Sequence, residues 1–366
     1  MPADHAADAA VLVVGRRSGL VETVHRGHAV LCDAGGTCLW HAGDASFQTY
    51  PRSALKYFQT LPLLQTGVAE AFGFSDEELA VMCASHSGEA RHTAVVASIL
   101  AKAGLDPGGS QLQCGGHLPL GSGAGEALLR AGGAITPLHS NCSGKHAGFL
   151  AYCVLHKLPL ETYLHFDHPL QAAIRAEIAH FAGVEEGALH AGMDGCSAPA
   201  YALPLAACAR AYAQLGAVQA CPGREAARQR LVRAVLANPY MIGGEGRFCT
   251  ELMACRCNGG GNGGSGSGGV LGKLGADGFY AVAILRGGGL GLCVKIEDGA
   301  HGPQYSVVAQ ALEDMGVVGE GELKAWACTP VKTVVGAVVG GREVVREALK
   351  GLPSLGAEAA QESGPT

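Results

Sequence analysis

The order in which strand-like and helical patterns follow one another most constrains how this chain can fold. Near its start, apolar β-type runs occupy Val11–Arg17, Leu20–Asp33 and Thr37–Gly43, with glycine-containing turns between them. Similar runs return late in the chain, at Gly278–Leu285 and Leu290–Ile296. Between them, apolar residues recur at the spacing typical of amphipathic helices. This order favours an α+β fold in which the terminal strands share one antiparallel sheet and the helical region packs against it.

The helical middle can be divided into separate segments by its periodicity. Helices are predicted at Ser53–Leu64, His92–Gly104, Ser143–Leu158, His168–Ala182, Leu203–Leu215 and Arg224–Asn238. Ser75 followed by Glu78 predicts a capping box at the start of one more helix. Arg286–Gly289 predicts a hairpin turn, and Val307–Met315 and Glu343–Leu349 predict further helices.

Composition supports one large globular domain. The chain has 366 residues, of which 48% are hydrophobic and 16% charged, a balance that allows a substantial core. We predict a single catalytic domain over residues 11–352, with disordered ends at 1–10 and 353–366. Residues 258–269 are almost entirely glycine, asparagine and serine, which predicts a flexible insertion within that domain.

The net charge and the cysteine content limit which cellular compartment and which partners we expect for the protein. The formal net charge is −6 and no long basic run occurs, so neither nucleic acid nor an anionic membrane is an expected partner. The first ten residues do not resemble a secretory signal, and no apolar run approaches the roughly 18 residues of a membrane span. We therefore expect a cytoplasmic protein whose 14 cysteines are mostly buried thiols.

Three short polar motifs occur in an order that suits serine–lysine hydrolysis. Ser53 and Lys56 form S-x-x-K, Ser85 opens S-x-S, and Lys273 opens K-x-G. Residues i and i+3 share a helix face, so the first serine and lysine can touch. A lysine acts as a base only when neutral, and both burial and a nearby cation disfavour its charge. We predict that Ser53 is the nucleophile and Lys56 its base, with Lys273 as the second cation and Ser85 as a proton relay between the lysines. The sequence leaves open which of the two serines attacks.

Each motif alone has an ordinary explanation. Ser53 and Lys56 suit a pair of surface neighbours, Ser85 and Ser87 suit a turn, and Lys273 suits a solvated strand edge. The three motifs together match the order S-x-x-K, S-D-N, K-T-G of the penicillin-recognising serine enzymes. Ser87 departs from that pattern, because it stands where asparagine is usual.

Two cysteine-containing loops form a second polar cluster. Asn141-Cys-Ser-Gly-Lys-His146 lies at the start of a predicted helix, and Asp194-Gly-Cys-Ser-Ala-Pro199 has the glycine and proline of a tight loop. Cys142 and Cys196 can converge on a metal or a ligand, although structural zinc sites use four nitrogen or sulfur ligands. The alternative is two ordinary buried thiols.

These segments together resemble the asparaginase II family, the Rhizobium etli-type class of L-asparaginases. The resemblance runs from about Val11 to about Leu349 and is specific because five motifs occur in order. The motifs are Pro51-Arg-Ser-Ala-Leu-Lys56, Ala84-Ser-His-Ser-Gly-Glu89, His139-Ser-Asn-Cys-Ser-Gly-Lys-His146, Asp194-Gly-Cys-Ser-Ala-Pro199 and Gly272-Lys-Leu-Gly-Ala-Asp-Gly278.

The resemblance implies a fold like that of serine β-lactamases and penicillin-binding enzymes, and a homodimer. It implies hydrolysis of L-asparagine to L-aspartate and ammonia, with the serine–lysine pairs Ser53–Lys56 and Ser85–Lys273. Cys249 corresponds to a further active-site cysteine. Asp277 departs from the family motif, which usually has glutamate.

The resemblance also implies one zinc ion per subunit, held by Cys142, Lys145 and Cys196, that aids substrate binding rather than activating water. For the reaction itself we predict an acyl-enzyme intermediate. Arg52 is a candidate clamp for the substrate α-carboxylate and Asp194 for its α-ammonium group, or the two form a structural ion pair.

Two other functions remain open from the sequence. One is a different serine–lysine amidohydrolase, such as a glutaminase or a β-lactamase-like enzyme. The other is a cysteine-rich metal-binding protein without catalysis, which requires Lys56 to be an ordinary charged lysine.

Overall fold

The structure is a computed structural model that describes residues 8–217, 223–255 and 269–355. The chain forms two compact units. Unit 1 contains Met1–Pro51, Leu203–Ala220 and Ala254–Thr366, and unit 2 contains Arg52–Ala202 and Cys221–Met253. The predicted insertion and the two predicted disordered ends lie almost wholly outside the described residues.

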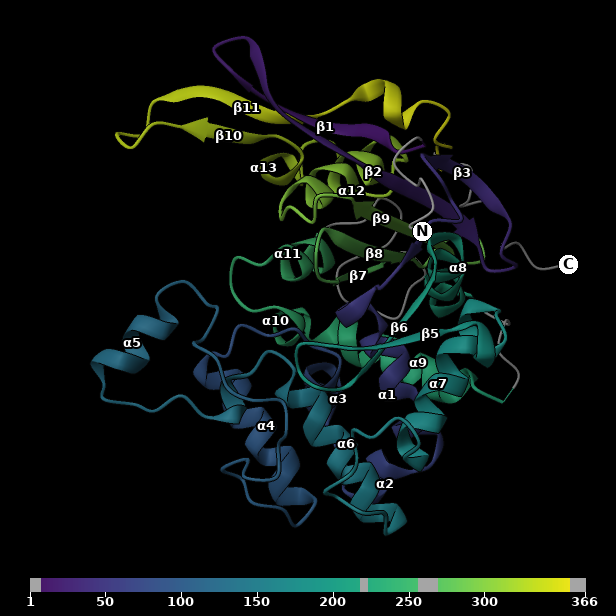
Figure 1. Ribbon diagram of the computed structural model, residues 1–366, viewed down its shortest axis with the longest axis vertical. Helices are drawn as coiled ribbons and strands as arrows, with labels where there is room; N and C mark the ends of the chain where they lie inside the picture. The colour runs from purple at the N-terminus through teal and green to yellow at the C-terminus, as the bar shows by residue number, and fades with distance from the viewer. Residues whose placement is uncertain (1–7, 218–222, 256–268, 356–366) are drawn as a thin grey trace, which may run out of the picture. The chain divides into compact units, whose positions relative to one another are not determined.

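Unit 1 is built on one antiparallel sheet with the strand order β10-β11-β1-β2-β9-β8-β7, and β3 pairs with β2 (Figure 1). Its strands are β1 (Ala10–Arg17), β2 (Leu20–Asp33), β3 (Cys38–Ala42), β7 (Val270–Leu274), β8 (Phe279–Ile284), β9 (Leu290–Ile296), β10 (Thr329–Lys332) and β11 (Val338–Val344). The early strands β1 and β2 therefore lie between late strands in one sheet, which confirms the predicted pairing of the terminal strands.

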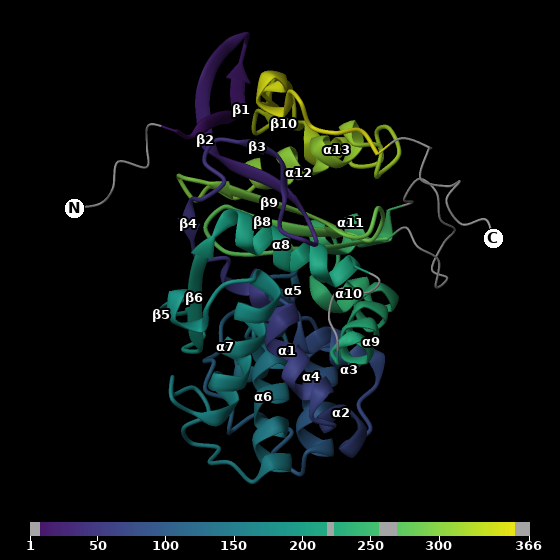
Figure 2. The ribbon, with the colours of Figure 1, turned by 90° about the vertical axis from the view of Figure 1, so that its right-hand side faces the viewer.

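Helices cover both faces of the central strands of this sheet. Figure 2 shows α8 (Leu205–Gly216) and α12 (Pro303–Asp314) on opposite sides of β8 and β9, and both helices contact both strands. Every residue of β8 is buried as a result. Gly291 of β9 allows α8 to approach closely, because a Cβ there would lie 1.8 Å from the carbonyl oxygen of Ala209.

Unit 2 is mainly helical. Its helices are α1 (Lys56–Gln65), α2 (Val68–Ala71), α3 (Asp76–Met82), α4 (Ala90–Lys102), α5 (Ala124–Arg130), α6 (Ser143–His156), α7 (Pro169–Ala182), α9 (Glu225–Ala237), α10 (Pro239–Ile242) and α11 (Phe248–Ala254, whose last residue belongs to unit 1). The strand β5 (His190–Met193) pairs antiparallel with residues 199–202 of β6 (Pro199–Pro204). In unit 1, the end of β6 pairs with β4 (Gln48–Thr49).

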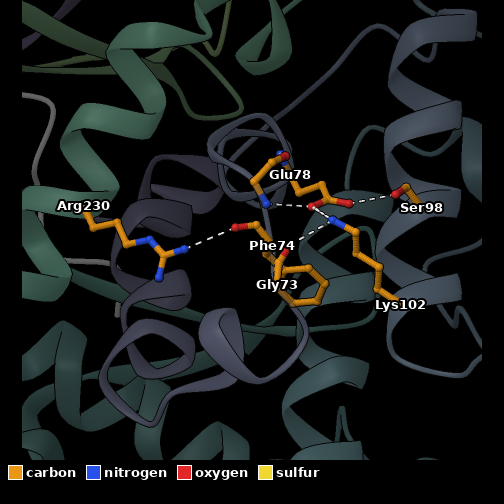
Figure 3. A network of polar contacts seen from close by, with 7 residues as sticks. Gly73, Phe74, Glu78, Ser98, Lys102 and Arg230 are labelled. Carbon is orange, nitrogen blue, oxygen red and sulfur yellow. Dashed lines mark hydrogen bonds and ion pairs between the residues drawn. The ribbon is translucent and has the colours of Figure 1, made fainter.

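The predicted capping box is confirmed at the start of α3. The Ser75 hydroxyl accepts from the backbone N–H of Glu78, and the Glu78 carboxylate accepts from the N–H of Ser75. Figure 3 shows that the same carboxylate also accepts from Lys102 at 2.6 Å and from Ser98 at 2.8 Å, both on α4. One buried carboxylate thus caps α3 and joins it to α4.

Some elements differ from the sequence prediction. The helix predicted from Ser53 begins with a 3₁₀ turn, Arg52–Leu55, before α1. The helix predicted over Glu343–Leu349 is wrong, because β11 continues to Val344 and only a 3₁₀ turn, Arg346–Leu349, follows. The mixed architecture agrees with α+β, and the β-lactamase-like fold stays a prediction. None of the helices in the described ranges is long and apolar enough to span a bilayer.

Candidate active site

Lys56 is a buried lysine whose amino group is surrounded by oxygen atoms. It is the first residue of α1 and has no exposed surface. Its Nζ donates to Ala84 O, to Ser85 Oγ at 3.2 Å and to Asn141 O at 3.4 Å. All three partners are oxygen atoms of unit 2, one from a hydroxyl and two from backbone carbonyls. The interpretation of Lys56 as a surface lysine is therefore wrong.

Lys56 contacts the hydroxyl of Ser85, as the predicted proton relay requires, and its pairing with Ser53 stays a prediction. Ser53 lies one turn before α1, in the 3₁₀ turn, and is half-buried. Arg52 starts this turn with a φ of 53°, a left-handed conformation that non-glycine residues seldom adopt. Residues i and i+3 also share a face in a 3₁₀ turn, so this geometry does not argue against the predicted Ser53–Lys56 pair.

The segment that carries Ser85 is fixed from both sides. The N–H of Ser85 donates to Ile242 O at 3.1 Å, and the Ser87 hydroxyl donates to Gly243 O at 2.7 Å. Arg247 donates to the same Ser87 oxygen at 3.2 Å. These contacts leave the Ser85 hydroxyl held against Lys56, as proton transfer between the two requires.

His86 anchors the same segment to α6. Its Nδ1 accepts from the N–H of Gly88 at 3.1 Å, so Nε2 carries the proton and donates to Ser143 Oγ at 2.9 Å. Burial, with a contribution from His92, holds the pKa of His86 well below its usual value. A neutral His86 therefore serves as a fixed structural donor beside Ser85.

Cys142, Lys145 and Cys196 converge, as the sequence predicted. Lys145 Nζ donates to Cys196 Sγ at 3.2 Å, and all three side chains are buried. A hydrogen bond from Cys142, together with the charge of Lys145, lowers the pKa of Cys196 to about 4 despite its burial. The same bond and burial raise the pKa of Cys142 to about 12. The cluster therefore holds one thiolate, one thiol and one ammonium group.

This thiol cluster lies next to Lys56. Asn141, whose carbonyl accepts from Lys56, directly precedes Cys142, and the charge of Lys56 also acts on the Cys142 thiol. Close packing places α6 here, since a Cβ on Gly144 would lie 2.1 Å from Val81 O at the end of α3. The serine–lysine pair and the cysteines therefore form one site.

Arg52 and Asp194 form an ion pair beside this cluster. Arg52 Nε and Nη2 donate to Asp194 Oδ1 at 2.8 and 2.6 Å. Burial alone would raise the pKa of Asp194, but Lys145 and Arg52 hold it below its usual value. Asp194 thus links the arginine to the charged end of the thiol cluster.

Strained backbone conformations fall inside the motif segments. Besides Arg52, Ser197 beside Cys196 has a φ of 66°, and Asp277 in the K-x-G motif has a φ of 52°. Non-glycine residues in this region are uncommon and gather where function fixes the backbone. Aspartate adopts it more readily than glutamate, which gives the departure at Asp277 a physical reason.

The remaining two catalytic candidates are both buried. Lys273 lies on β7, the last strand in the sheet order of unit 1, and its Nζ donates to Leu274 O at 3.0 Å. Its interpretation as a solvated lysine is wrong, and its pairing with Ser85 stays a prediction. Cys249 lies on α11 close to Tyr57, whose pKa burial and this cysteine raise well above its usual value.

The zinc prediction can be compared with the donors that the cluster offers. A thiolate, a second thiol and an amine suit zinc, once Cys142 and Lys145 lose their protons. Within the described ranges, no group of three or more His, Cys, Asp or Glu side chains is placed to hold a metal. Lysine is not among these residue types, so the cluster offers two sulfurs and the Lys145 nitrogen, and a zinc site there stays a prediction.

The residues that hold the Ser85 segment were not predicted to have a role. His86 and Ser143 lie within the five motifs, so their positions carried a signal but their partners did not, and Arg247 lies outside all five. Ile242 and Gly243 contribute backbone carbonyls, which any residue type supplies. No pattern of side chains could have identified them.

Two comparisons with known proteins bear on this site. A family model described as L-asparaginase II matches residues 13–344 of the chain. No curated protein sequence matches this chain. The matched range includes every candidate residue described above.

Proposed function

Because the chain belongs to the L-asparaginase II family, which makes it an amidohydrolase with a small-molecule substrate, we propose that it hydrolyses L-asparagine to L-aspartate and ammonia. The observation that carries this proposal is the contact of the buried Lys56 amine with the Ser85 hydroxyl at 3.2 Å. A lysine removed from water beside a serine is a recognised means of activating a weak nucleophile.

The proposed chemistry is acyl transfer through a serine. Lys56, in its neutral form, accepts the proton of the Ser85 hydroxyl as the serine oxygen attacks the side-chain amide carbon. The carbon–nitrogen bond breaks, and the proton passes from Lys56 to the leaving ammonia. Water then hydrolyses the β-aspartyl ester and restores the serine. Ser53 is the alternative nucleophile, with Lys273 and Cys249 completing the proposed catalytic set.

The Arg52–Asp194 pair suits the head group of a free amino acid. The guanidinium group offers donors to an α-carboxylate, and the carboxylate offers acceptors to an α-ammonium group. Their side chains are 27% and 14% exposed, so part of each charge remains accessible. We propose that the two groups recognise the zwitterion as a unit.

We also propose that Cys142, Lys145 and Cys196 hold a zinc ion. A bound zinc ion would act as a Lewis acid that attracts substrate oxygens. The thiolate of Cys196 is the donor that is already ionised.

Ammonia release from L-asparagine tests the proposal. Ser85→Ala and Lys56→Met are expected to lower kcat by about 10³-fold or more, because coupled catalytic groups fail together. Arg52→Gln is expected to raise KM about tenfold with a smaller change in kcat, because it removes a charged hydrogen bond to the substrate. L-glutamine and nitrocefin, assayed in parallel, distinguish a glutaminase or a β-lactamase-like enzyme.

Mass spectrometry of the trapped acyl-enzyme identifies the nucleophile. An adduct on the peptide containing Ser85 supports the assignment, and an adduct on Ser53 transfers the role to the S-x-x-K serine. Near-parental kcat in both Ser85→Ala and Lys56→Met would contradict serine–lysine catalysis. Ser98→Ala is the matched control, since its hydroxyl bonds to Glu78 instead.

A further inference from the structure

A pair of cysteines in unit 1 lies directly opposite one another in the sheet. Cys32 is near the end of β2 and Cys38 is the first residue of β3, and the two are register partners. The N–H of Asp33 donates across the hairpin to Thr37 O at 3.0 Å. Since successive N–H groups of a strand point to opposite sides, the N–H of Cys32 points away from β3. The two cysteines therefore form a non-hydrogen-bonded pair.

This position brings the two thiols close enough to react. Opposite residues at such a position have Cα atoms about 4.5 Å apart, the shorter of the two antiparallel spacings. Disulfides form over Cα separations of about 4.4–6.8 Å. The thiols already interact, because burial and then the contact with Cys38 raise the pKa of Cys32 to about 12.

The hairpin is closed around the pair before any covalent bond forms. Gly36 N–H donates to Asp33 O at 3.1 Å, and Thr37 N–H donates to Asp33 Oδ1 at 2.8 Å. A bulge in the next register step leaves Leu39 as the extra residue on β3. A disulfide would therefore join two strand ends that the turn already holds at the required separation.

Accessibility gives the two sulfurs different roles. Cys38 is exposed, whereas Cys32 is fully buried. Cys208 and Cys293 lie close to Cys32, but both are fully buried as well. Cys328 is the other exposed free cysteine of the described residues, and it faces no cysteine in the strand register. An oxidant in solution therefore reaches Cys38 first, with Cys32 as the thiol behind it.

We propose that Cys32 and Cys38 form a peroxide-sensitive dithiol site that closes reversibly to a disulfide. Hydrogen peroxide oxidises the Cys38 thiol to a sulfenic acid and is reduced to water. The Cys32 sulfur then attacks the Cys38 sulfur, the S–S bond forms, and the sulfenic oxygen leaves as a second water with the Cys32 proton. A dithiol reductant reverses the change by thiol–disulfide exchange. In the oxidised form, the disulfide links β3 covalently to β2, the strand through which β3 pairs with the sheet.

Peptide mapping of the whole, fully reduced protein after mild hydrogen peroxide tests this site. In the wild type, the peptides containing Cys32 and Cys38 are expected to lose two hydrogen atoms in total, to resist alkylation and to recover both thiols with dithiothreitol. In Cys32→Ser, Cys38 is expected to remain a sulfenic acid that dimedone captures. Cys38→Ser is expected to leave Cys32 a thiol, and Cys328→Ser is the control that closes like the wild type.

Three results would overturn the proposal. The first is unchanged alkylation of Cys38 after peroxide, and the second is its direct conversion to a sulfinic acid in the wild type. The third is a disulfide that joins Cys32 to Cys208 or Cys293. Far-UV circular dichroism of both serine variants establishes that the sheet has formed. This test does not depend on the proposed hydrolysis, because it measures the masses of the peptides that contain Cys32 and Cys38 and not the activity.

Discussion

Among single residues, Cys196 is the one on which proposed metal binding depends most directly. Its sulfur contacts both other donors, with Lys145 Nζ at 3.2 Å, and it is the donor already ionised near neutral pH. We predict that Cys196→Ser abolishes stoichiometric zinc binding, because a serine hydroxyl is neither soft nor ionised. Metal analysis after dialysis against a zinc buffer measures this directly.

Cys153→Ser is the matched control for that prediction. Cys153 is a buried free thiol on α6, the helix that carries Lys145. The Cys153→Ser variant is expected to bind zinc as the wild type does. Equal zinc content in Cys196→Ser and the wild type would contradict the assignment of these ligands. A wild type that takes up no zinc from the buffer would contradict metal binding itself.

The sequence identified the residues of the site better than their partners. The residue types and motif order brought Lys56, Ser85 and the three zinc candidates to attention, and the structure brings these five together. The contact of Lys56 with Ser85 agrees with the predicted relay, whereas the left-handed Arg52 and the 3₁₀ turn could not be read from the spacing. Local geometry of this kind depends on contacts from distant segments.

Among the elements, the α3–α4 junction offers a test of stability against pH. Burial alone would raise the pKa of Glu78, but hydrogen bonds from Lys102, Ser75 and Ser98 hold it below its usual 4.5. Its contribution is therefore complete above the unfolded-state pKa and is lost as the pH falls through the lower folded-state pKa. The Lys102 side chain is 36% exposed, so we expect the charge of Glu78 to add about 1 kcal/mol to the free energy of unfolding, close to the value of a surface ion pair.

Glu78→Gln is expected to lose about that amount at pH 7, because glutamine keeps the capping geometry but not the charge. The difference from the wild type should shrink as the pH falls below 4.5. Urea unfolding at several pH values measures it. Glu126→Gln, in the exposed pair with Arg130 on α5, is the control and should change little. A constant difference at all pH values would contradict the role of charge.

Elements with a strong local signal were predicted well. The strands β2 and β9 have the predicted bounds, and the Ser75–Glu78 capping box is present, because alternation and capping are properties of a few neighbouring residues. β7 was missed because it holds a glycine and a lysine in five residues. The helix expected over Glu343–Leu349 gave way to β11, since pairing with β1 continues to Val344.

For the whole molecule, the division into two units was not predicted from the sequence. Each unit is assembled from separated stretches of chain, so no boundary appears as a linker or a change in composition. The sheet order could not be derived either, because β11 and β1 come from opposite ends of the chain. Long-range pairing depends on which faces remain to be buried once local elements have formed.

We propose that the homodimer implied by the family forms through one end of the sheet of unit 1. The turns after β1 and β10 meet there, since Ser18 N–H donates to Val339 O at 2.8 Å. The exposed apolar side chains at this end include the 78% exposed Leu20, the 91% exposed Val335 and the 64% exposed Val338, and Val334 next to Val335 is exposed as well. Such a cluster marks a surface that is covered in an assembly.

Val335→Glu is expected to shift the protein from dimer to monomer in sedimentation velocity, because a carboxylate at this end resists burial. Met193→Glu, at another exposed apolar side chain, is the control and should leave the mass unchanged. A dimer that persists in Val335→Glu would place the interface elsewhere on the chain.

The surroundings of Lys56 have a consequence for how the protein tolerates change. Its amine joins backbone positions 28 and 85 residues further along the chain, at Ala84 and Asn141, and also contacts a serine hydroxyl. A shorter or neutral side chain would free two carbonyl groups at once and loosen the loops that carry Ser85 and Cys142. We therefore expect the residue at position 56 to be limited twice, by the proposed catalysis and by these backbone contacts, and an arginine, with its larger planar head group, suits neither.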